Sequence, residues 1–101
     1  MTYSLEQSIP REKLAEFCQR NHIQRLSVFG SAIRDQLKAD SDIDLLVEFK
    51  PDHTPGLFSI VRMEMELADA LGRKVDLRTP EDLSRYFRDE VIKHAQLQYQ
   101  A

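Results

Sequence analysis

The fold is decided by residues 30–49, GSAIRDQLKADSDIDLLVEF. In the second half of this stretch, apolar residues recur from position 43 to 49 with the period of two that is typical of a β-strand, so these side chains share one face. Asp42 and Asp44 then share the opposite face. We therefore expect a strand with one side in a hydrophobic core and an acidic side that faces away from it. The apolar members of this strand are Ile43, Leu45, Val47 and Phe49.

Gly30 and Ser31 separate two predicted elements, a strand over residues 23–29, IQRLSVF, and a short helix over residues 32–38, AIRDQLK. A loop between a strand and a helix offers backbone N–H groups, a hydroxyl and the positive end of the helix dipole to a phosphate. Glycine also lets the backbone approach a phosphate closely. A Gly-Ser pair alone is more often an ordinary turn. The hypothesis that this pair binds phosphate therefore depends on its position before the acidic strand in the sequence.

The rest of the chain shows further helical and extended patterns. Pro10 can open a helix and Gly72 can end one, because proline suits a first helical turn and glycine suits a C-terminal cap. Glu64 falls near the apolar stripe of its helix, where a charged residue is unexpected. The predicted elements are a helix from about Pro10 to His22, a helix from Leu57 to Gly72, a strand over residues 73–79, and a helical region that opens at Thr79, breaks near Ser84 and runs to about Tyr99.

The paired carboxylates of Asp42 and Asp44 point to a metal. Two carboxylates side by side on one strand face repel each other unless a cation lies between them. Oxygen ligands favour a hard ion, and Mg²⁺ usually takes one or two protein carboxylates and completes its shell with water and substrate phosphates. Asp76, on a separate strand, can supply a third carboxylate that holds a second metal or accepts a proton. This set of acids suits phosphoryl transfer.

Two other interpretations fit the acidic residues less well. A solvated strand face is the simplest one, but the strand is otherwise too apolar for it. A calcium-binding EF-hand loop that began at Asp40 would need glycine at its sixth position and glutamate at its twelfth, where this chain has Leu45 and Pro51. The EF-hand interpretation is therefore rejected.

Composition limits the class of protein. With 101 residues, of which 42% are hydrophobic, we expect a single domain over residues 1–101. The formal net charge of −3 offers no broad basic surface, so we expect no direct binding of nucleic acid. The lone Cys18 cannot form an internal disulfide, and no apolar run approaches the roughly 20 residues that span a bilayer. We expect a cytoplasmic protein with no membrane contact.

Residues 30–49 closely resemble the GSxxR…SDxD signature of the minimal nucleotidyltransferases in the DNA polymerase β superfamily. The resemblance continues through GRKVDL at residues 72–77 and the tail TPEDL…YFRDEVIKHA at residues 79–95, and it covers the chain from about Pro10 onward. It implies an α+β fold with a mixed sheet of about three to four strands flanked by helices. It also implies ATP or another NTP as donor, two Mg²⁺ ions, and attack on the α-phosphate with pyrophosphate leaving.

The resemblance also assigns roles to individual residues. By it, Asp42, Asp44 and Asp76 are the catalytic and metal-binding acids. The residues that it assigns to nucleotide or phosphate binding are Gly30, Ser31, Arg34 and Ser41. Many relatives have glycine where this chain has Asp35, so the helix after the loop is the part where we expect a difference.

Short relatives of this kind are similar to the antitoxins of HEPN/MNT toxin–antitoxin pairs. The resemblance implies that the partner is a HEPN-domain toxin, silenced by transfer of AMP onto a tyrosine. The alternative is a non-catalytic antitoxin that acts by binding alone, against which the intact acids argue. A nucleic-acid-binding module is disfavoured by the net charge and by the absence of a basic and aromatic stripe. An oligomer remains compatible with the sequence.

Overall fold

A computed structural model describes residue 5 and residues 8–30 and 42–101 of the chain. The elements are α1 (Arg11–Arg20), β1 (Ile23–Phe29), β2 (Ile43–Phe49), α2 (Leu57–Leu71), β3 (Val75–Arg78), the 3₁₀ helix η3 (Pro80–Asp82), α3 (Arg88–His94) and β4 (Gln96–Gln100). The strands form one mixed sheet in the order β3-β2-β1-β4, with β2 and β3 parallel and the other pairs antiparallel. The predicted α+β class with a mixed sheet is confirmed. The helix expected over residues 32–38 lies outside the described residues.

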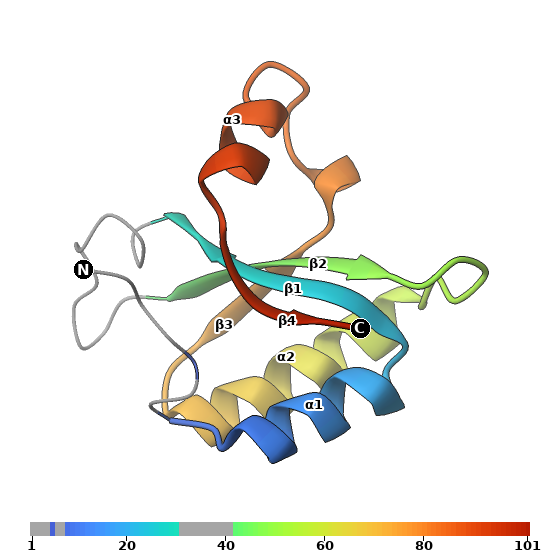
Figure 1. Cartoon of the computed structure of the whole chain (residues 1–101), viewed down its shortest axis with the longest axis vertical. Helices are drawn as coiled ribbons and strands as arrows, with labels where there is room; N and C mark the ends of the chain where they lie inside the picture. Colours follow the sequence, from blue (N-terminus) through green and yellow to red (C-terminus); the bar gives the residue numbers. More distant parts are fainter. Residues whose placement is uncertain (1–4, 6–7, 31–41) are drawn as a thin grey trace.

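The sheet separates the helices. Figure 1 shows α1 and α2 next to each other on one side of the strands and α3 on the other side. The core lies between the sheet and the first two helices, since Leu14 and Phe17 of α1 and Met63 and Leu67 of α2 are buried. The strand residues that complete this core are Ile23, Leu26, Val28, Ile43, Leu45, Val47, Val75 and Leu77.

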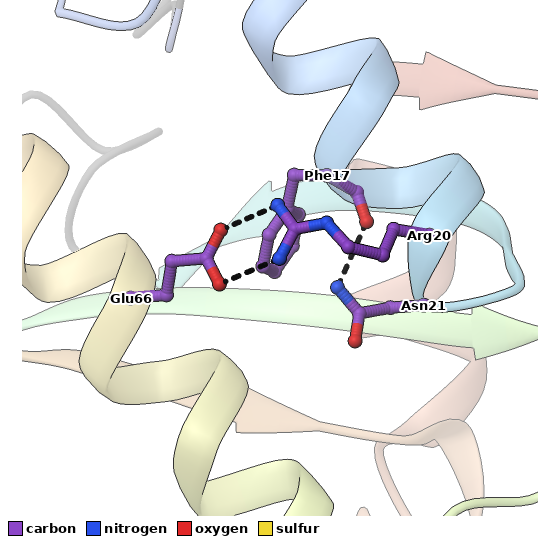
Figure 2. Close-up of polar contacts among 4 residues, drawn as sticks. All are labelled: Phe17, Arg20, Asn21 and Glu66. Atoms are coloured by element: carbon purple, nitrogen blue, oxygen red, sulfur yellow. Dashed lines mark hydrogen bonds and ion pairs between the residues drawn. The ribbon is translucent and has the colours of Figure 1, made fainter.

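The helices α1 and α2 are also joined by a surface ion pair. Figure 2 shows the guanidinium of Arg20 donating two hydrogen bonds to the carboxylate of Glu66, at 3.1 and 2.8 Å. Both side chains are exposed, so solvent screens the pair and it adds little to stability. The side-chain amide of Asn21 donates to the carbonyl of Phe17 and helps to end α1. Burial of apolar area therefore holds these helices more firmly than their charges do.

Both helix ends near the core follow the predicted signals. Helix α1 begins directly after Pro10, and α2 ends at Gly72, whose φ of 71° is in the left-handed region. The N–H of Gly72 donates to the carbonyl of Ala68 at 2.8 Å, which satisfies one of the last helical carbonyls. No helix in the described part of the chain is long and apolar enough to cross a membrane.

The prediction for the C-terminal region was partly wrong. Thr79 and Asp82 form the expected capping box, in which the N–H of Thr79 donates to Oδ2 of Asp82 at 3.1 Å, but it opens only the short helix η3. The chain leaves helical structure at Leu83, close to the predicted break. Residues 96–100 then form β4 and not a helix.

The physical reason is the open edge of β1. An unpaired strand edge exposes a row of backbone donors and acceptors, and the C-terminal residues pair with it in antiparallel fashion. The last such bond joins the N–H of Ala101 to the carbonyl of Gln24 at 2.9 Å. This gain depends on a distant part of the chain, so a local helical pattern could not reveal it.

Candidate active site

Two aspartates are brought level by the parallel pairing of β2 and β3. Asp44 is the register partner of Asp76, between the pairs Ile43–Val75 and Leu45–Leu77. Since Leu45 and Leu77 are buried in the core, the two aspartates project from the opposite face of the sheet. Asp42 lies directly before β2 and, two residues from Asp44, belongs to that same face. The predicted clustering of these acids around two strands is present in the structure.

The acids crowd one another. Burial raises the pKa of Asp44, and the neighbouring carboxylates of Asp76 and Asp42 raise it further, while Arg78 acts in the opposite direction. The carboxylate of Asp42 has its own partial counterion, Nζ of Lys74 at 3.8 Å. Negative charge on Asp44 is therefore disfavoured, and a cation placed there would relieve the repulsion.

Gly30 packs against the side chain of Asp44. Its φ is +75°, and a Cβ atom at this position would lie 2.6 Å from Oδ2 of Asp44 and 3.4 Å from its carboxyl carbon. Phe29, the residue before it, is the register partner of Asp44 in the antiparallel pair of β1 and β2. Any larger residue at position 30 would both strain the backbone and push the carboxylate aside. The glycine thus shapes the position of the acid.

The other residues assigned to phosphate binding are not placed by the structure. Ser31, Arg34 and Ser41 lie outside the described residues, as does Asp35. Of the predicted nucleotide-binding set, the structure therefore places Gly30 alone, next to the acids.

The carboxylates suit a divalent cation by their chemistry. Within residues 42–101 and the described residues before them, no three acidic, histidine or cysteine side chains form a ready-made cluster that could hold a metal. Mg²⁺ does not need such a cluster, because it commonly binds one or two carboxylates and takes its other ligands from water and phosphates. Oxygen-only donors, crowded negative charge and a neighbouring glycine fit this type of ion. Asp42 and Asp44 are the residues that would hold it.

Glu64 has a structural role that the sequence only hinted at. Its Oε2 accepts a hydrogen bond from the N–H of Leu77 at 2.8 Å, so a side chain of α2 satisfies the outer backbone edge of β3. Leu77 directly follows Asp76, and the contact therefore anchors the strand at the third acid. The signal in the sequence was an acidic residue close to the apolar stripe of α2.

Comparisons with known proteins found similar sequences over most of the chain. The chain matches the family model described as polymerase beta, nucleotidyltransferase, over residues 12–101. It is 33% identical to a protein of Methanocaldococcus jannaschii that is provisionally named a protein adenylyltransferase, over 84% of this chain and 89% of that protein. It is 39% identical to the protein adenylyltransferase MntA of Thermococcus cleftensis, over 61% of each chain.

Solved structures show the same fold. A provisionally named minimal nucleotidyltransferase is 34% identical and superimposes with a TM-score of 0.72 over 92% of this chain and 94% of that one. A chain from a toxin–antitoxin structure with AMP-PNP gives a TM-score of 0.73 at 22% identity, over 92% and 75%. A chain from the complex of a tri-AMPylated Shewanella oneidensis HEPN toxin with an MNT antitoxin gives 0.63 at 22% identity, over 90% and 70%.

Proposed function

Since this chain belongs to the polymerase beta family of nucleotidyltransferases, we propose that it transfers AMP from ATP onto a hydroxyl of a partner protein. The observation that carries the proposal is the level placement of Asp44 and Asp76 on adjacent strands, with Gly30 packed against Asp44. Phosphoryl transfer uses such a set of acids, because carboxylate oxygens hold its metals and can accept the proton of the attacking hydroxyl.

Asp42 and Asp44 would bind Mg²⁺, which when bound offsets the negative charge of the donor's phosphates. Burial and like charge at Asp44 make this position receptive to a cation. Asp76 lies on the other strand and would serve the acceptor, as a ligand of a second Mg²⁺ and as the base that takes the proton of the attacking hydroxyl. Gly30 keeps the carboxylate of Asp44 in place and, with Ser31, would approach the triphosphate.

For the acceptor, we propose a tyrosine of a HEPN-domain toxin, with this chain as its antitoxin. Support comes from the name of the Thermococcus cleftensis relative, a protein adenylyltransferase, and from the Shewanella oneidensis complex that contains a tri-AMPylated HEPN toxin. A cytoplasmic location is part of the same proposal. The competing possibility, an antitoxin that acts by binding alone, predicts neutralisation without any transfer.

The decisive test is label transfer. The purified chain is mixed with α-labelled ATP, Mg²⁺ and the product of any HEPN-type reading frame found beside its gene, and the toxin is examined for labelled tyrosine. We expect labelling by the unmodified protein and by Asp69→Asn, a control that removes an exposed carboxylate of α2. The double variant Asp42→Asn, Asp44→Asn should transfer nothing. Undiminished transfer by the double variant would disprove the metal assignment, and neutralisation without labelling would favour the binding-only antitoxin.

A second test measures ligand binding without a partner. Mg²⁺ and ATP together should raise the melting temperature more than the sum of their separate effects, because the donor's phosphates complete the metal shell and the metal offsets the acids. Tight ATP binding that a chelator does not weaken would contradict the proposed bridging by Mg²⁺.

A further inference from the structure

A pocket of about 730 Å³ lies between the end of β1 and helix α3. Figure 1 shows that α3, which carries part of the lining, lies on the side of the sheet opposite α1 and α2. The volume of the pocket is in the range of pockets that enclose small ligands, roughly 300–1,000 Å³. The described residues that line it are Phe29, Gly30, Phe87, Glu90, Val91, His94 and Gln96.

The pocket is continuous with the acidic site. Phe29 and Asp44 are register partners in an antiparallel pair, so their side chains project from the same face of the sheet. Gly30 lines the pocket and also contacts Asp44, since its missing Cβ would lie 2.6 Å from Oδ2 of that residue. A ligand in the pocket therefore reaches Asp44 directly past Gly30.

The strand order decides which reactant this ligand can be. In the order β3-β2-β1-β4, Asp44 on β2 separates Asp76 on β3 from the pocket beside β1 and β4. A molecule in the pocket approaches Asp44 from the side opposite Asp76. Because Asp76 is the acid proposed to serve the acceptor, the pocket lies on the donor side.

On the α3 side, the described lining has no cation for a phosphate and offers apolar surface to a nucleoside. Among the described lining residues there is no lysine or arginine, and His94 is paired with the carboxylate of Glu90 at 3.3 Å. That carboxylate would repel a triphosphate but can accept hydrogen bonds from ribose hydroxyls. Phe29, Phe87 and Val91 supply apolar surface, and the side chain of Phe87 is 54% exposed. An aromatic ring of this kind can stack on a base.

We propose that this pocket binds the nucleoside half of the donor nucleotide, with Phe87 against the base and Glu90 on the ribose hydroxyls. The inference rests on the proposed nucleotidyltransferase function and adds the residues that contact the base and ribose of the donor nucleotide. It places the base and ribose on α3, away from the acids, and leaves the triphosphate to the region around Gly30 and Asp44.

The test compares two probes by calorimetry, Mg²⁺-ATP and Mg²⁺-tripolyphosphate, which lacks a nucleoside. Phe87→Ala should weaken binding of ATP by roughly 5- to 100-fold, the loss expected for one stacked base, and leave tripolyphosphate binding unchanged. The matched control is Tyr86→Ala, which removes a neighbouring aromatic side chain that is 84% exposed and absent from the described lining of the pocket. This control should bind both probes as the unmodified protein does.

The ribose contact is tested with 2′,3′-dideoxy-ATP. The unmodified protein should prefer ATP to the dideoxy compound several-fold, and Glu90→Gln should reduce this preference. Asp89→Asn, which changes the adjacent exposed acid of α3, is the control and should retain the preference.

The outcomes separate the two proposals. If Phe87→Ala and Glu90→Gln bind ATP like the unmodified protein, or weaken ATP and tripolyphosphate equally, the pocket does not hold the nucleoside, and the proposed function still stands. If the unmodified protein binds neither probe in the presence of Mg²⁺, the proposed function fails and this inference fails with it. Circular dichroism of each variant identifies any loss of binding that is due to unfolding.

Discussion

Asp44 and Leu45 are neighbours on β2, yet they belong to two different regions of the molecule. Leu45 has no exposed surface and packs in the core between the sheet and helices α1 and α2. Asp44 projects from the opposite face, where burial and then two further carboxylates raise its pKa. The comparison teaches that one face of the sheet contributes most of the stability, while on the other face crowded negative charge lowers it.

The two faces also treat polar groups differently. On the core side, burial raises the pKa of the Cys18 thiol to about 12, so that it stays neutral and behaves as a small apolar residue. On the acidic side, Asp42 and Asp44 retain partial access to solvent and, in the case of Asp42, a nearby lysine. Charge is excluded from one face and concentrated on the other.

The largest effect is expected from Asp76→Ala, which removes an acid from the open face. Donor binding should survive, since Asp42 and Asp44 are the acids proposed to share the donor's metal. Turnover should fall by roughly 10²- to 10⁴-fold, the usual contribution of a positioned base. Calorimetry with Mg²⁺-ATP and initial rates of label transfer measure the two quantities. Equal transfer rates in variant and unmodified protein would show that Asp76 is only a strand residue.

The next largest effect is expected on the face of the sheet that packs against α1 and α2. Leu45→Ala should lower the free energy of unfolding by about 2–5 kcal/mol, because it removes buried methyl groups and leaves a cavity. Urea denaturation measures this change. Where the variant remains folded, it should bind Mg²⁺-ATP with the same affinity as the unmodified protein. A variant of normal stability would mean that Leu45 lies outside the core.

Three glycine-to-alanine variants together test whether the contact between Gly30 and Asp44 matters. Gly30→Ala should cost about 1–2 kcal/mol for a side chain in the left-handed region and more for the contact with Asp44, and it should impair transfer. Gly72→Ala has the same backbone strain, at φ +71°, but its new Cβ would have no non-neighbouring atom of the described residues within 4 Å, and Gly56→Ala has neither the strain nor such a contact. We expect stability to fall in the order Gly56→Ala, Gly72→Ala, Gly30→Ala, with transfer lost only in the last. Similar transfer rates in all three would contradict the role of Gly30 at the acid.

The smallest effect is expected from Asp44→Asn in the absence of metal. The substitution removes the charge that burial, Asp76 and Asp42 all disfavour, so the melting temperature should rise by a few degrees at neutral pH. With Mg²⁺ and ATP present, the variant should have the lower melting temperature of the two proteins, because it has lost a metal-binding carboxylate. A thermal melt of both proteins with and without ligands is sufficient. A lower melting temperature of the metal-free variant would show that Asp44 makes a stabilising contact.

Local signals predicted much of this molecule. The alternation in residues 43–49, the proline before α1 and the glycine after α2 each describe interactions within a few residues of chain, and the structure confirms them. The helix predicted to run to about Tyr99 failed because residues 96–100 instead form β4 and pair with β1, which lies about 70 positions earlier. The expected roles of Ser31, Arg34 and Ser41 stay predictions.

The sequence by itself determined the acidic strand, its apolar reverse side and the glycine before it, since side-chain alternation along a strand follows from backbone geometry alone. Only the tertiary structure decided that Asp76 stands level with Asp44, that Glu64 anchors the edge of β3 and that α3 closes a pocket beside Gly30. The reason is that these relations depend on strand register and order. Both are set by pairing between residues far apart in the chain, which no local pattern records.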